Sequence, residues 1–414
     1  MGSVHWRDRC LTTTKLMGLR TAVAEILLAD VVTASRAGAW LTDSSGWPHA
    51  ILLARQWRVV PNLYERVEQI GASLPPAELT ILRKELLHDY SQSAFRALVG
   101  IQAAIALEEE GISVAAFKGA ASMAYLYGGP KYRTSQDVDL LIQPKDLAAA
   151  LGRLDTLGFQ KEWSEPLADY LQFIENGPAF AGNRAAMLYG PKGGEIDLHW
   201  QLEGSGLETE TVLCRLQRVE LMGASIPVAD PADCFLLTMH HLIRENLSIE
   251  SGIRDLLDLK RWCEHFEQAD RMDLVLQCAS DCGTITSTLA VLNILAGYDQ
   301  GSAAAHAARR LEQRCTFSQQ RSAARLTELF HYQLRQGALN KDVFHLVHLR
   351  PWRQVLRGLL TTRMSYRQTM LGMERRRGGE IPLSRRIVQI AQSLPGFRGL
   401  RLARELARIK YRRD

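Results

Sequence analysis

The feature that most constrains the fold is a pair of aspartates that leads into an apolar run. Asp137 and Asp139 precede Leu140-Leu141-Ile142. Side chains two residues apart in a strand share a face, so both carboxylates are expected to point the same way. Two like charges so close raise each other's pKa, which favours a bound cation. Carboxylate oxygens suit Mg²⁺ or Mn²⁺, and the sequence therefore predicts a magnesium or manganese site.

A second acidic strand is predicted downstream. Glu195, Asp197 and His199 alternate with apolar residues and so share one face. If this strand pairs beside the first, Asp197 completes a cluster of three carboxylates able to hold two metal ions for displacement at phosphorus. Glu195 is interpreted as a charge on the rim of the site. His199 either orients Asp197 or the acceptor, or packs as a structural side chain.

A strand, a glycine turn and a helix are predicted upstream of the aspartates. The apolar segment from Ile112 to Phe117 ends at Lys118-Gly119, and the segment from Ala120 to Tyr127 is typical of a helix. The N–H groups at the start of this helix would suit a triphosphate, and Ser122 could add a hydroxyl.

The order of these segments resembles a known family. Lys118-Gly119, the stretch from Arg133 to Asp139 and the stretch from Asp197 to Trp200 are similar to motifs of the bacterial uncharacterised nucleotidyltransferases, a branch of the DNA polymerase β-type nucleotidyltransferase superfamily. The resemblance extends over about residues 57–266. The superfamily's usual Gly-Ser turn is Gly119-Ala120 here, so a hydroxyl contact to phosphate would fall to Ser122.

The resemblance implies a fold, a reaction and a set of site residues. The implied fold class is α+β, with a small mixed-sheet nucleotidyltransferase core flanked by N- and C-terminal helical regions. The implied reaction moves a nucleoside monophosphate from an NTP to a hydroxyl or phosphate of a small-molecule or peptide acceptor and releases pyrophosphate. The implied catalytic and metal-binding residues are Asp137, Asp139 and Asp197, and the implied nucleotide-binding residues are Lys118, Gly119, Ser122, Arg133, His240, Arg254 and Asp258.

Alternatives remain open for several of these residues and for the reaction. Arg133 could be an ion-pairing structural residue, and His240, Arg254 and Asp258 could form a buried polar cluster that ties two helices together. The protein could instead add nucleotides to tRNA, as toxin-type relatives of the superfamily do, or bind a nucleotide or partner without chemistry. The sequence contains no Walker-A loop, no G-x-G-x-x-G fingerprint and no G-x-S-x-G elbow, so ATPase, dehydrogenase and α/β-hydrolase functions lose support.

Four regions are expected along the chain. They are a helical region at 1–95 that includes a helix from Thr21 to Ala39, the core at 96–225, a helical domain at 226–300 and a basic helical region at 301–414. The last region has 24 Lys and Arg against 7 Asp and Glu, whereas residues 1–300 have 26 against 38. The basic region could bind RNA, an acidic partner or an anionic membrane, but docking on the acidic part of the same chain or simple solvation is favoured.

The sequence also predicts a cytoplasmic location. No apolar run approaches the ~18 residues of a membrane span, and the amino terminus has no apolar core of a signal peptide. The seven cysteines are odd in number and scattered, so they are expected to be reduced thiols.

Overall fold

One mixed sheet surrounded by helices forms the centre of the fold. The computed structural model describes residues 13–161, 185–190, 193–202, 205–245, 247 and 249–336. Within these residues, seven strands form a sheet of order β3-β4-β5-β2-β1-β7-β6. The strands are β1 (Val114–Phe117), β2 (Val138–Ile142), β3 (Gln160–Lys161), β4 (Ala185–Tyr189), β5 (Glu195–His199), β6 (Gln217–Leu221) and β7 (Ala224–Val228). The mixed sheet and its flanking helices confirm the predicted fold class.

The two central strands are completely buried, which explains their apolar sequences. Every residue of β1 and β2 is shielded from solvent, as expected where helices cover both faces of a sheet. Strand β1 runs antiparallel to β2 and parallel to β7. Strand β2 runs parallel to β5 and places Asp139 directly opposite Asp197. The predicted pairing of the two acidic strands is therefore confirmed.

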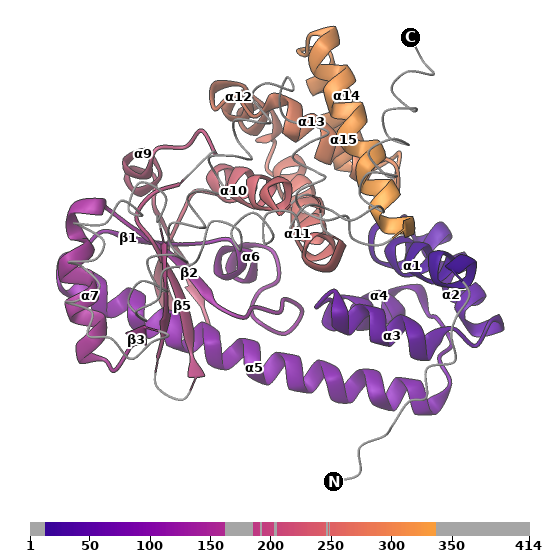
Figure 1. Ribbon diagram of the computed structural model, residues 1–414, viewed down its shortest axis with the longest axis horizontal. Helices are drawn as coiled ribbons and strands as arrows, with labels where there is room; N and C mark the ends of the chain where they lie inside the picture. Colours follow the sequence, from indigo (N-terminus) through magenta and orange to yellow (C-terminus); the bar gives the residue numbers. More distant parts are fainter. Residues whose placement is uncertain are drawn as a thin grey trace, which may run out of the picture. The chain divides into compact units, whose positions relative to one another are not determined.

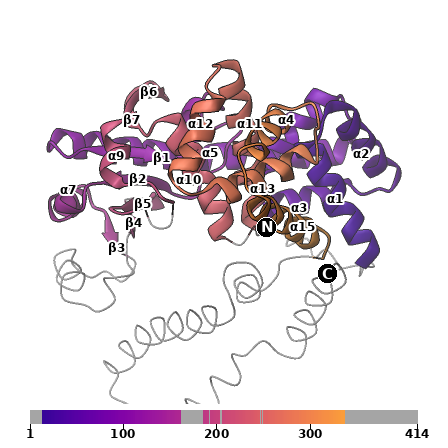
Figure 2. The same cartoon turned by 90° about the horizontal axis from the view of Figure 1, so that it is seen from above.

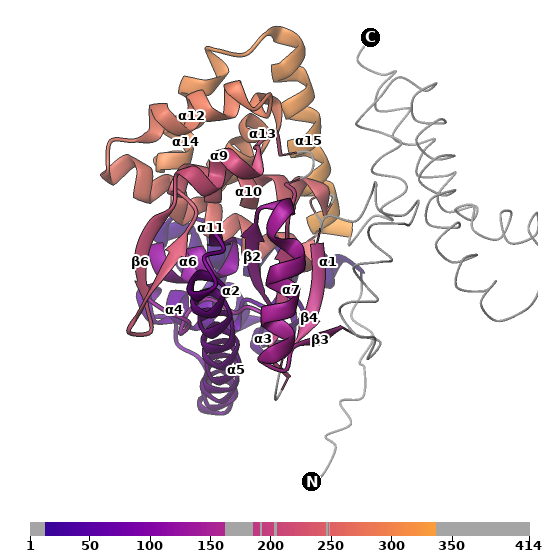
Figure 3. The ribbon, with the colours of Figure 1, turned by 90° about the vertical axis from the view of Figure 1, so that its left-hand side faces the viewer.

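A long helix, α5 (Pro76–Glu109), packs along the sheet (Figure 1). The contact is close because Gly100 faces Val138 of β2, and a Cβ atom at Gly100 would lie 2.5 Å from a Val138 methyl group. Helix α7 (Leu147–Thr156) lies beside α5 (Figure 3), with Arg153 Nη2 3.1 Å from Glu109 Oε2. Helix α5 runs without a break through residue 95, where the sequence suggested that the core begins.

Four shorter helices precede α5: α1 (Thr13–Leu28), α2 (Val31–Asp43), α3 (Trp47–Gln56) and α4 (Val60–Ile70). The prediction of a single helix from Thr21 to Ala39 is wrong, because α1 ends at Leu28 and a new helix begins after Asp30. Asp30 caps α2 by accepting a hydrogen bond of 2.9 Å from the backbone N–H of Thr33. A side chain that satisfies a free N–H at a helix start competes with continuation of the preceding helix.

Six helices of the described residues follow the sheet, and the first two of them lie between the strands and the N-terminal helices (Figure 2). The six are α10 (Pro231–Arg244), α11 (Ile249–Gln268), α12 (Met272–Asp281), α13 (Ile285–Ala296), α14 (Ala303–Glu312) and α15 (Phe317–Gln336). Three short elements of the described residues are α6 (Gly119–Tyr125), η1 (Pro144–Asp146) and α9 (Thr209–Cys214). None of the helices in the described residues has the length and apolar character needed to cross a membrane. The basic clusters at 375–377, 385–386 and 398–413 lie outside the described residues.

Candidate active site

Three potential metal ligands meet where β2 pairs with β5. Asp139, Asp197 and His199 each place one ligand atom within 4.8 Å of the others. His199 Nε2 lies 3.1 Å from Asp139 Oδ1 and 2.9 Å from Asp197 Oδ2. The strand register explains the cluster, because Asp139 is opposite Asp197 and His199 follows two residues later on the same face. Two carboxylates and one imidazole form a donor set that fits a divalent cation.

A lysine neutralises one of these carboxylates. Lys118 Nζ lies 2.5 Å from Asp139 Oδ1 and 5.1 Å from the centre of the Phe117 ring. Lys118 has a positive φ of 48°, which is uncommon for a residue with a side chain. The next residue, Gly119, packs closely against the loop before β2, since a Cβ atom there would lie 2.9 Å from Ser135 Oγ and would require that side chain to shift. The Lys-Gly turn thus holds the ammonium group on Asp139.

The two aspartates of the motif have opposite electrostatic environments. Burial raises the pKa of Asp137, and the nearby Asp139 carboxylate raises it further. Burial alone would also raise the pKa of Asp139, but Lys118 and the hydrogen bond from His199 outweigh it and hold this pKa well below its usual range. Burial would lower the pKa of His199, yet its hydrogen bonds to Asp139 and Asp197 raise it. The expectation that the pair simply raise each other's pKa is therefore wrong for Asp139.

Asp137 is not part of the group of three ligands, although it lies within its electrostatic range. It precedes the first residue of β2 and is half-buried. The charges of Asp139, Lys118 and Asp197 all act on the pKa of Asp137. Glu195 is also outside the group. The described residues thus bring together two carboxylates and a histidine, where the sequence suggested three carboxylates.

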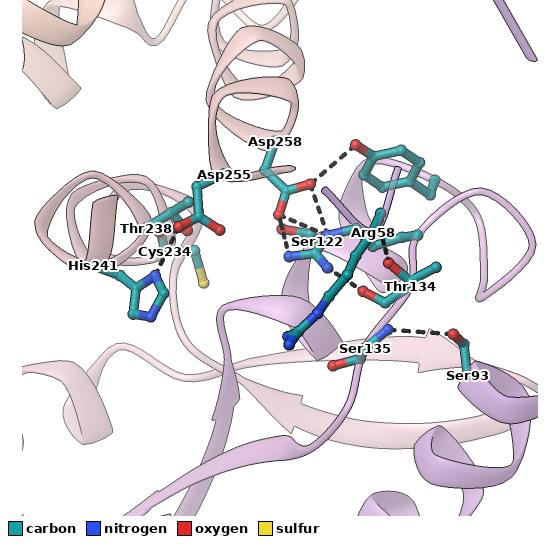
Figure 4. A network of polar contacts seen from close by, with 12 residues as sticks. Arg58, Ser93, Ser122, Thr134, Ser135, Cys234, Thr238, His241, Asp255 and Asp258 are labelled. Atoms are coloured by element: carbon teal, nitrogen blue, oxygen red, sulfur yellow. Dashed lines mark hydrogen bonds and ion pairs between the residues drawn. The ribbon is translucent and has the colours of Figure 1, made fainter. Parts of the chain in front are cut away.

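A buried polar cluster lies behind this site (Figure 4). Asp258 of α11 accepts hydrogen bonds from Arg133 Nε at 2.8 and 2.9 Å, from Ser122 Oγ at 2.9 Å and from Tyr127 Oη at 3.0 Å, and Arg133 Nη2 lies 2.7 Å from Asp258 Oδ2. Burial would lower the pKa of Arg133, but Asp258 holds it above its ordinary value. Ser122, Arg133 and Asp258 are at most 3% exposed. The structure thus shows the ion-pairing alternative for Arg133, and contact of these residues with a nucleotide stays a prediction.

The loop that leads into β2 is fixed by three further contacts. Ser135 N–H donates to Ser93 Oγ at 3.3 Å (Figure 4), and Arg96 Nη1 donates to the Ser135 carbonyl at 3.0 Å. Thr134 Oγ1 donates to the Arg58 carbonyl at 2.7 Å. Contacts to α5 and to the α3–α4 connection therefore hold the backbone immediately before Asp137.

The remaining predicted residues lie on α10 and α11. His240 is half-buried on α10. The ring of its neighbour His241 contacts α11, with Nδ1 2.7 Å from Asp255 Oδ2. Arg254 of α11 has a buried Nε atom without a hydrogen-bond partner. Burial lowers the pKa of Arg254, and the nearby Arg133 lowers it further.

Sequence reasoning underestimated two residues. His199 was left open as a packing residue, although its position two residues after Asp197 on one strand already placed it on the acidic face. Lys118 was interpreted as a phosphate ligand, and its ion pair with Asp139 could not be seen because the two residues are 21 positions apart. No local signal in the sequence reports such a pair.

Paired strands that present two aspartates beside a glycine turn are the architecture expected of a nucleotidyltransferase core. The family model described as uncharacterised nucleotidyltransferase matches residues 43–297. This match covers more than half of the chain, so the chain belongs to that family. No curated protein and no solved structure matches the chain significantly.

Proposed function

We propose that this protein is a metal-dependent nucleotidyltransferase that moves a nucleoside monophosphate from an NTP to a hydroxyl or phosphate of a small-molecule or peptide acceptor in the cytoplasm. The single observation that carries the proposal is the Asp139, Asp197 and His199 group at the junction of two paired strands. Membership of a nucleotidyltransferase family supports it.

Each side chain of the site has a role in this proposal. Asp139, Asp197 and His199 would hold Mg²⁺ or Mn²⁺, and Asp137 would complete the acidic site. When bound, the cation would neutralise charge on the phosphate oxygens and lower the pKa of the acceptor hydroxyl. Lys118, whose ammonium group pairs with Asp139, would then be able to turn to the phosphates.

These groups account for the bonds that change and for the proton that is released in the proposed transfer. The acceptor oxygen attacks the α-phosphorus, a new phosphorus–oxygen bond forms, and the bond from the α-phosphorus to the bridging oxygen breaks as pyrophosphate leaves. Asp197 takes the acceptor proton, since it is the more exposed carboxylate of the pair, with 22% of its side chain exposed against 8% for Asp139.

The test is pyrophosphate release from each labelled NTP with Mn²⁺ or Mg²⁺, with and without a metabolite extract or total tRNA. Release that depends on the extract and disappears in Asp139→Asn supports the proposal, with Glu195→Gln on the paired strand β5 as the control. Release only with tRNA selects nucleotide addition to tRNA, for which the net positive charge of residues 301–414 is the supporting observation. Nucleotide binding without release under every condition selects a binding module.

A further inference from the structure

The solvent face of helix α5 lacks charge over five turns. Leu87 is 66% exposed, Leu98 44% and Ile105 36%. From residue 87 to residue 105, no exposed position of α5 is Asp, Glu, Lys or Arg. The solvent face of a helix normally carries charged and polar side chains. Depletion of charged residues is instead a property of the centre of protein interfaces.

The exposed apolar residues of α5 lie in one line. Eighteen residues make about five turns of an α-helix, so Leu87 and Ile105 point in the same direction, and Leu98 deviates from it by only about 20°. The stripe from Leu87 to Ile105 is about 27 Å long at 1.5 Å per residue. Figure 1 shows α5 at the margin of the described residues, with the sheet and the N-terminal helices on one side of it. An aligned stripe, unlike single scattered apolar residues, indicates an interaction surface.

Charges of opposite sign lie at the two ends of the stripe. Arg83 and Lys84 are exposed just before it. Glu108 and Glu109 follow it, and 63% of the Glu109 side chain is exposed although it contacts Arg153. A surface with an apolar centre, a positive end and a negative end is complementary to a copy of itself that runs in the opposite direction.

We infer that the α5 stripe binds the α5 stripe of a second copy of this chain, with the two helices antiparallel. A two-fold contact uses the same surface on both copies, so each residue before its middle lies opposite a residue equally far beyond the middle. With the middle at residue 96, Leu87 lies opposite Ile105 of the second copy, and Lys84 lies within one residue of Glu109. Parallel helices would instead place Lys84 against Lys84 and Glu109 against Glu109, which is repulsive.

Sedimentation velocity of the full chain over a range of concentrations tests the inference without ligand or catalysis. One helix face is a small interface, so wild type should dimerise with a dissociation constant in the micromolar range. Leu98→Glu should raise this constant about tenfold or more, because it places a carboxylate at the apolar centre of the contact. The matched control is Leu274→Glu on α12, where the leucine is 47% exposed, and it should leave dimerisation unchanged.

Charge reversal tests the direction of the two helices. In the antiparallel dimer, Lys84→Glu alone and Glu109→Lys alone each bring like charges together, so each variant should dimerise several-fold more weakly than wild type at low salt. An equimolar mixture of the two variants restores opposite charges at both ends and should associate about as tightly as wild type. Parallel helices predict no weakening in the single variants, because their like charges already meet in wild type.

Three results overturn the inference. The first is a wild-type protein that stays monomeric at every concentration. The second is a dimer that Leu98→Glu leaves intact, since another surface would then join the copies. The third is a mixture of Lys84→Glu and Glu109→Lys that associates no more tightly than either variant alone. A monomeric wild type whose melting temperature falls on Leu98→Glu would assign the stripe to a segment of the same chain, which also overturns the inference.

Discussion

Neutralising Asp139 should lower the melting temperature, whereas neutralising Asp137 should raise it. In metal-free protein, Asp139→Asn removes the partner of Lys118 and His199. Loss of one partner from a buried ion pair costs about 3–5 kcal/mol. Because 19% of the Lys118 side chain is exposed, we expect roughly 3 kcal/mol. At about 2–4 °C per kcal/mol, the melting temperature should fall by about 6–12 °C. Asp137→Asn instead removes a buried charge and its repulsion by Asp139. A gain of roughly 1 kcal/mol in the free energy of unfolding would raise the melting temperature by about 2–4 °C.

Thermal melting in EDTA near neutral pH measures both changes, and Glu195→Gln serves as the control on the same sheet. The pH dependence gives an independent check. Because the folded pKa of Asp139 is lowered, its contribution is present above the ordinary carboxyl pKa of about 3.9 and is lost as the pH falls through the lowered value. Shifts of the same sign for Asp137→Asn and Asp139→Asn would refute this electrostatic description of the site.

Three further predictions concern the neighbours of these aspartates. Asp197→Asn should abolish pyrophosphate release with modest loss of nucleotide binding, whereas Glu195→Gln should change little; a larger effect of Glu195→Gln in the release assay would contradict the proposed site. The pKa of His199 is raised, so its charge stabilises the metal-free protein below about pH 6.5, and this stability is lost as the pH rises through the raised value. His199→Gln should therefore reduce the change of melting temperature with pH in this range. An unchanged pH dependence would show that the charge of His199 does not stabilise the fold. Asp258→Ala should cost about 3–5 kcal/mol in urea unfolding by leaving Arg133 buried and unpaired, and adding Arg133→Met should recover part of the loss; additive losses would show that the two side chains do not act as a pair.

Local periodicity was sufficient to predict β1 and the two strands that carry the acidic residues, β2 and β5, but not the other four strands of the sheet. Residues at alternate positions of a strand share a face, so Asp197 and His199 could be placed together before their strand was seen to pair with β2. The glycine turn before α6 was also predictable, because the apolar segment ends at Lys118-Gly119. These features depend on residues close in sequence.

The partners of the charged side chains could not be predicted in the same way. Arg133 and Asp258 are 125 positions apart, and their contact depends on where α11 crosses the loop before β2. Long-range packing, which periodicity does not report, decides which charges meet.

The Arg133–Asp258 contact also sets the smallest piece of this chain that can be inherited or transplanted as a unit. A fragment that ended at Val228 would keep the seven strands and the Asp139, Asp197 and His199 group, but it would lack α11 and with it Asp258, the carboxylate that neutralises Arg133. Recombination between relatives that exchanged the sheet without α11 would separate the same ion pair. The family match, which runs from residue 43 to residue 297, includes both halves of the pair.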